Sequence, residues 1–147
     1  MKLIYAYWFN PGYNQHEPIC LSYEANERNL PSEPDHTTDF EEERILAALL
    51  GNSDSLYSAP FAKDKLNNPS VKRQLISTEG WDAEIVGDEV QMRFAFASED
   101  PEDEDYQPIL FLPRKEVAYA MEKWLAFLQR DIDPNYSEII DTKEAYR

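Results

Sequence analysis

Apolar residues alternate most regularly with polar ones between residues 81 and 97. Two strand-like arms, 81–86 and 89–97, flank Gly87-Asp88, and Gly-Asp is a favoured two-residue hairpin turn because glycine tolerates a positive φ. One face of the second arm is apolar and consists of Val90, Met92, Phe94 and Phe96. This alternation predicts an antiparallel hairpin in a sheet that is covered on one side.

Other segments have the aromatic, β-branched or aliphatic character of strands. We predict strands at residues 2–9, 19–23, 71–77 and 109–112, of which 19–23 has the weaker signal and 109–112 is expected to be buried. Loops are predicted at residues 26–37 and 51–70, where Asn, Ser and Pro accumulate.

Two segments have helical periodicity. The first, residues 39–50, starts within the capping-box pattern Thr38-Asp39-Phe40-Glu41 and is expected to end at Gly51. The second, about 114–130, follows Pro113 and is expected to cover the bare face of the sheet. Its apolar face consists of Val117, Met121, Trp124, Leu125 and Leu128.

The order of these elements predicts one α+β domain that spans residues 1–147. We expect a mainly antiparallel sheet with two principal helices packed on it. The tail, residues 131–147, is expected to dock as an extended segment or a short helical turn. With 147 residues, 42% of them apolar, the chain is long enough to bury a core without disulfides or metal ions.

The net charge of the chain limits the kinds of partner that it is expected to bind. The chain has 29 acidic and 14 basic residues, which give a formal net charge of −15. This excess argues against nucleic acid or an anionic membrane as the direct partner, and it favours steered association with a cationic surface. A simpler alternative is that the charge only maintains solubility, as in many acidic cytosolic proteins.

The cellular location follows from cysteine use and hydropathy. A single cysteine, Cys20, rules out an internal disulfide framework and suits a reducing cytoplasm. The apolar N-terminus, residues 1–9, is too short and too aromatic for a signal peptide, and no apolar run approaches a membrane-spanning length. We expect a cytoplasmic protein without membrane association, and the oligomeric state stays open.

No motif dictates a catalytic chemistry. The chain lacks the nucleophile-elbow, Walker and Rossmann patterns, and its four glycines leave little material for a phosphate-binding loop. His16 precedes Cys20 by four residues, a spacing that allows a Cys–His nucleophile pair but comes without an orienting partner. A buried cysteine near an exposed histidine is the better interpretation. We predict no enzymatic activity and no cofactor.

The sequence supports a metal site little better than it supports a catalytic one. One cysteine and two histidines, His16 and His36, lack the spacing of zinc ligands. Residues 131–135 begin like a calcium-binding loop, but Tyr136 stands where glycine is required and Thr142 where the bidentate glutamate is required. Weak binding of a divalent cation by the acidic residues 99–105 stays open as an alternative.

The strongest functional signal is the run from Glu99 to Tyr106, which has six acids and no base. A tyrosine beside acids suits a recognition surface, because it adds contact area at a low entropic cost. The alternative is that residues 98–107 are only a solvated loop between two strands.

Two further acidic zones, residues 33–43 and 131–141, would form a cation-binding face if the fold brought them near this run. Basic residues gather elsewhere, at Lys63, Lys65, Lys72 and Arg73. The predicted partner-binding residues are Glu99, Asp100, Glu102, Asp103, Glu104, Asp105, Tyr106, Asp131, Asp133 and Tyr136.

In the C-terminal third, residues 111–117 lead from a strand into a helix that contains the Trp/Leu-rich segment 124–128, and an acidic loop precedes them. This arrangement resembles bacterial toxin-immunity proteins, which neutralise toxins delivered by contact-dependent inhibition, secretion systems or colicins. The resemblance assigns no specific family. It implies a one-to-one complex with a basic, nuclease-type toxin domain whose active site the acidic side chains cover.

An immunity-type inhibitor of a basic partner is therefore our first hypothesis. A DNA mimic or anti-restriction factor is a second, and it requires carboxylates spaced along a surface like phosphates. A carboxylate-based enzyme is a third, and it requires converging carboxylates with perturbed pKa values in a cleft. A structural or regulatory subunit is the fourth.

Overall fold

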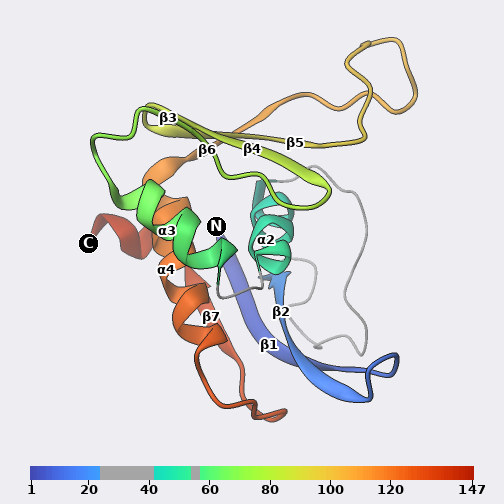
Figure 1. Ribbon diagram of the computed structural model, residues 1–147, viewed down its shortest axis with the longest axis vertical. Coiled ribbons are helices and arrows are strands. Elements are labelled where there is room, and N and C mark those ends of the chain that lie inside the picture. The colour runs from blue at the N-terminus through green and yellow to red at the C-terminus, as the bar shows by residue number, and fades with distance from the viewer. Residues whose placement is uncertain (24–41, 54–56) are drawn as a thin grey trace.

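Two antiparallel sheets and three α-helices make up the part of the chain that the computed structural model describes, residues 1–23, 42–53 and 57–147 (Figure 1). The first sheet has the order β2-β1-β7 and consists of β1 (Lys2–Asn10), β2 (Gln15–Ser22) and β7 (Glu138–Asp141). The second has the order β3-β4-β5-β6 and consists of β3 (Arg73–Leu75), β4 (Trp81–Val86), β5 (Glu89–Phe94) and β6 (Leu110–Pro113).

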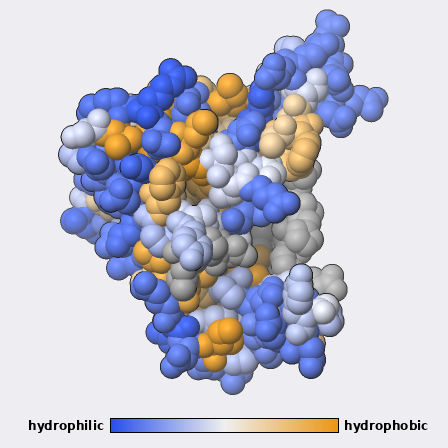
Figure 2. All heavy atoms as spheres, in the orientation of Figure 1, coloured by the Kyte–Doolittle hydropathy of each residue, from blue (hydrophilic) through white to orange (hydrophobic). Residues whose placement is uncertain are grey.

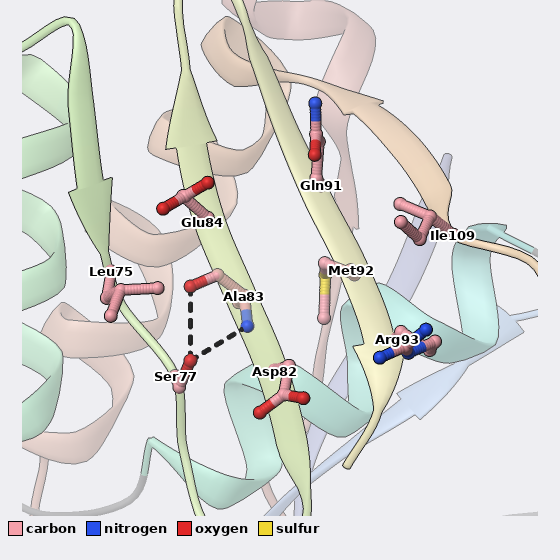
Figure 3. Close-up of a pocket in the computed structure, with 9 residues that line it drawn as sticks. All are labelled: Leu75, Ser77, Asp82, Ala83, Glu84, Gln91, Met92, Arg93 and Ile109. Carbon is pink, nitrogen blue, oxygen red and sulfur yellow. Dashed lines mark hydrogen bonds between the residues drawn. The ribbon is translucent and has the colours of Figure 1, made fainter. Parts of the chain in front are cut away.

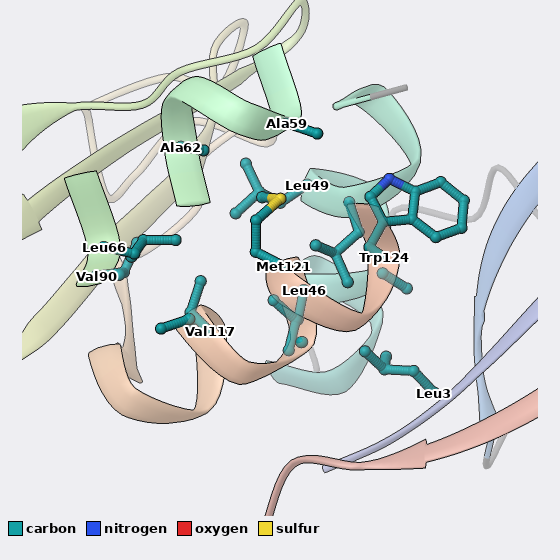
Figure 4. Close-up of a cluster of buried hydrophobic side chains, with 14 of the residues drawn as sticks. Leu3, Leu46, Leu49, Ala59, Ala62, Leu66, Val90, Val117, Met121 and Trp124 are labelled. Atoms are coloured by element: carbon teal, nitrogen blue, oxygen red, sulfur yellow. The ribbon is translucent and has the colours of Figure 1, made fainter. Parts of the chain in front are cut away.

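The helices are α2 (Glu42–Asn52), α3 (Ser58–Asn67) and α4 (Arg114–Leu128), and a 3₁₀ turn, η1 (Thr142–Tyr146), follows β7. Both α2 and α4 contact strands of each sheet, and α3 packs along α4. Side chains from all three helices and from strands of both sheets therefore point into one core (Figure 4). The α+β class and the antiparallel pairing are confirmed, although the strands divide into two sheets and a third helix is present.

Trp124 on α4 lies at the centre of this core and is fully buried. Its indole N–H donates to the carbonyl of Ser53 at 3.1 Å, and its ring contacts Tyr5 edge-on at a centroid distance of 5.0 Å. The Tyr5 hydroxyl in turn donates to the carbonyl of Ala120 at 2.7 Å. Both polar groups are thus hydrogen-bonded inside the core, as buried polar groups must be.

The prediction of a loop over residues 51–70 was wrong, because α3 lies within it. Serine, asparagine and proline suggested a loop, but Pro60 stands in the first turn, where its missing N–H costs nothing. Ala59, Ala62 and Leu66 bury one face of the helix. Helix α2 also continues through Gly51 to Asn52. The predicted capping box, Thr38 to Glu41, and the predicted loop 26–37 lie outside the described residues.

Some strands begin or end at residues other than those predicted, because a strand extends only as far as its neighbouring strand pairs with it. Strand β5 stops at Phe94, so Phe96 does not continue its buried face and is 78% exposed. In β6 only Leu112 is buried, because that strand forms an edge of its sheet with one face towards solvent. Strand β2 starts earlier than predicted, at Gln15, because it pairs with the full length of β1. The tail forms both predicted alternatives, an extended strand and a short helical turn.

Arg114 joins three distant segments at the start of α4. Its guanidinium donates to the carbonyls of Lys65, Leu66, Asn68, Val71 and Gly87 at 2.6–3.0 Å. Each of its five N–H groups is therefore matched by a backbone oxygen. The first three carbonyls belong to the C-terminal end of α3, where a cation also complements the helix dipole.

Candidate functional site: an acidic loop beside an open sheet face

The four-stranded sheet has one buried and one solvent-facing side. Ala83, Ile85, Val90, Met92 and Leu112 point towards the helices. The opposite side, called the open face below, carries Arg73, Leu75, Asp82, Glu84, Glu89, Gln91, Arg93, Ile109 and Phe111. The strand register aligns Leu75, Glu84, Gln91 and Phe111 in a single row across all four strands.

A shallow pocket of about 310 Å³ lies on the open face (Figure 3). Leu75 and Ile109 form apolar walls, and Asp82, Glu84, Gln91 and Arg93 contribute polar groups. Ser77 bridges the backbone N–H and carbonyl of Ala83 at 3.0 and 3.2 Å, so the pocket floor is an ordered sheet. The pocket therefore offers both apolar contacts and hydrogen-bonding groups to an occupant.

Residues 98–107, called the acid loop below, project beyond the end of this sheet (Figures 1 and 2). The loop is closed at its base, where the Ser98 N–H donates to the Asp105 carbonyl at 2.9 Å. Within it, Asp100 and Asp103 accept backbone N–H groups two residues on, at 3.0 and 3.1 Å. These Asx turns order the backbone through hydrogen bonds within the loop itself.

The acid loop keeps its charges in solvent. All six of its acidic side chains are exposed. Glu99 forms the one ion pair found between this loop and the other described residues, with the Arg93 guanidinium at 2.9 Å. Because Arg93 also lines the pocket, this contact makes the acid loop and the open face neighbours.

The second predicted group, Asp131, Asp133 and Tyr136, lies elsewhere. It follows the C-terminal end of α4, and Figure 1 shows this segment at the opposite end of the long axis from the acid loop. Asp133 also accepts a backbone N–H two residues on, while Tyr136 donates to Glu138 and stacks under the Arg130 guanidinium. The structure therefore does not bring these three residues together with residues 99–106.

The remaining charged zones are also separate. Of the acidic zone 33–43, the structure describes Glu42 and Glu43 at the start of α2. The basic residues Lys63, Lys65, Lys72 and Arg73 lie on α3 and at the start of β3, at the other end of the four-stranded sheet from the acid loop (Figure 1). These four basic residues are therefore separate from the acid loop.

Comparison with known proteins identifies a family. A family model described as "Family of unknown function (DUF5376)" matches residues 1–146. The chain belongs to this family. No solved structure matches it.

Relatives are found in Pasteurella multocida (strain Pm70). UPF0275 protein PM0504 is 43% identical over 90 residues, which are 55% of this chain and 60% of the relative. UPF0275 protein PM0489 is 40% identical over 88 residues, which are 56% of this chain and 64% of the relative. With these two, the match spans less than two thirds of the relative. With UPF0275 protein PM0493 it spans 99% of both chains at 29% identity.

His16 and Cys20 do not form a nucleophile pair. Both lie on β2 with a separation of four residues, which is about 13 Å along a strand. His16 instead contacts the ring of Phe9 on the neighbouring strand. Burial raises the pKa of the Cys20 thiol well above its usual value, which disfavours the reactive thiolate. His36 lies outside the described residues.

Among the described residues, no three or more His, Cys, Asp or Glu side chains gather as a possible metal site, so the acid loop gives the cation-binding alternative no support. Among the described helices, none is both long and apolar enough to cross a membrane.

Sequence reasoning found the acid loop but missed the open face. The polar side of β5 was visible as an alternation, yet the side chains that complete the face come from three other strands or their ends: Leu75, Asp82, Glu84, Ile109 and Phe111. An apolar residue on the solvent side of an edge strand was the available signal. Leu75 and Phe111 are both of this kind, and both are exposed.

Proposed function

We propose that this protein binds a basic protein partner through the acid loop and acts in the cytoplasm as an immunity-type inhibitor of a nuclease-type toxin domain. The observation that carries the proposal is the placement of six solvated carboxylates on one ordered projection at the end of a sheet. A nuclease cleft that holds a phosphate backbone is cationic, so the charge of such a projection is complementary to it.

The internal hydrogen bonds of the acid loop support binding for a second reason. A loop that is already ordered loses little conformational entropy when it enters a complex. The Asx turns at Asp100 and Asp103 supply this order, and they leave Glu102, Glu104 and Asp105 with exposed carboxylates. These three side chains therefore reach a partner without first breaking a contact with the protein.

The first experiment is capture of a partner by the purified protein from a lysate of its native host at low salt. The result expected is one stoichiometric basic protein that elutes as salt rises, because charge steering is screened by ions. The purified partner should have nuclease activity that one equivalent of this protein abolishes. A captured partner without a toxic activity would overturn the immunity function.

Two pairs of charge reversals localise the contact. The variant Glu102→Lys/Glu104→Lys should slow association about tenfold at low salt, since steering accelerates encounter by about 10 to 1,000-fold. Its matched control is Glu122→Lys/Asp64→Lys, which changes the net charge equally at exposed residues on α4 and α3. Equal slowing by both pairs would show that net charge, not the acid loop, governs association.

A further inference from the structure

We infer that the open face is the second half of the partner interface and that it receives a cationic surface whose apolar side chains flank a lysine or arginine. The inference rests on the proposed function and names the chemistry of the partner. It starts from the row Leu75–Glu84–Gln91–Phe111, which crosses all four strands with apolar ends and a polar centre.

Both apolar ends of this row are exposed to solvent. Leu75 is 60% exposed and Phe111 is 48% exposed. The apolar side chains on the opposite side of the same sheet are buried. Ile109 adds a third exposed apolar group at the pocket wall. Single exposed apolar residues need no explanation, but three on one sheet face, of which Leu75 and Ile109 line its pocket, are typical of an interaction surface.

The charges on the open face determine the kind of partner. Its two arginines are already engaged, Arg73 with Glu84 at 2.9 Å and Arg93 with Glu99. Asp82 and Glu89 remain exposed and form no ion pair with the other described residues. The face is therefore complementary to a cation, and a lysine or arginine buries its aliphatic stem against Leu75 or Ile109 while its charged end meets Asp82.

The length of this row predicts the spacing of side chains in the partner segment that binds it. Three steps between adjacent strands separate Leu75 from Phe111 by about 14 Å, which an extended segment spans in about four residues. The partner segment should thus carry two apolar side chains about four positions apart, with a basic residue between them. A second copy of this chain does not fit, because copies with a net charge of −15 repel each other.

The acid loop and the open face should control different rate constants of binding. Exposed charges act over a distance and accelerate association, whereas buried apolar contacts determine how slowly a complex dissociates. Because Arg93 and Glu99 join the two regions, one partner is able to cover both. Loss of the acid loop should therefore change the association rate, and loss of the apolar ends should change the dissociation rate.

The test uses a random peptide library displayed on phage and selected on the immobilised protein. Enriched peptides should carry a lysine or arginine between two apolar residues. The variant Leu75→Ser/Phe111→Ser should weaken their binding at least about tenfold, through faster dissociation. The control Ile139→Ser/Ile132→Ser removes apolar residues of similar exposure, 60% and 55%, from β7 and the segment before it, and should bind normally.

Each outcome separates this inference from the proposed function. Enriched peptides without basic residues, no enrichment over the Leu75→Ser/Phe111→Ser variant, or equal weakening by the control would overturn the role of the open face. None of these results would alter capture of a basic partner through the acid loop. Sedimentation that shows a dimer broken by Leu75→Ser/Phe111→Ser would assign the face to a second copy and also overturn the inference.

Discussion

The acid loop and helix α4 lie within a few residues of each other in sequence but use their polar groups in opposite ways. Arg114 reaches five carbonyls that are 27 to 49 residues away, and Trp124 reaches Ser53 at a separation of 71 residues. The acid loop forms hydrogen bonds mainly within itself, with the contact between Glu99 and Arg93 as the exception among the described residues.

This difference separates charge that stabilises the fold from charge that is available to a partner. A cation removed from water must have its donors matched, and Arg114 meets that condition with backbone oxygens alone. The acid loop keeps its carboxylates hydrated, so they add little to stability and repel one another. Substitutions in the two regions should therefore affect different measurements.

Trp124→Ala should have the largest effect on the fold. The side chain is fully buried, so its removal leaves a cavity and an unmatched carbonyl at Ser53, and the free energy of unfolding should fall by about 3–5 kcal/mol. Urea denaturation followed by circular dichroism measures the change. Ile132→Ala, at an exposed position, is the control and should stay within about 0.5 kcal/mol of the parent. A loss below about 1 kcal/mol for Trp124→Ala would contradict the packing described.

Arg114→Lys should come next, with a loss of about 2–4 kcal/mol. Lysine keeps the charge but has three donors on one nitrogen and cannot reach carbonyls from α3, the segment before β3 and the β4–β5 turn together. The same denaturation experiment measures it, with Arg147→Lys at the exposed C-terminus as the matched control. Equal stability of the two variants would show that charge alone is sufficient at position 114.

Reversing the charges of the acid loop should have the smallest effect on stability. Lysine at Glu102, Asp103, Glu104 and Asp105 removes one Asx turn and changes the net charge from −15 to −7, which relieves repulsion. We expect a change within about 1 kcal/mol and an unaltered cooperative melting transition. Loss of that transition would show that the loop has a structural role and would remove the contrast with α4.

The sequence predicted those elements in which side-chain periodicity and burial agree. The β4–β5 hairpin formed around Gly87, whose φ of 60° is the conformation that suggested the turn. Helix α4 formed with Val117, Met121 and Trp124 on its buried face, as their spacing indicated. Helix α3 was missed because its short apolar stripe is composed mainly of alanine, which gives a weak hydrophobic signal.

For the candidate site, the sequence by itself determined that residues 99–106 are charged and solvated, because the run contains six acids and no base of its own. Only the tertiary structure decided their surroundings. It placed Asp131, Asp133 and Tyr136 at the far end of the molecule, and it aligned Leu75 with Phe111 across a sheet. Strand register and helix packing set such neighbours through contacts between distant residues, which the local order of side chains does not encode.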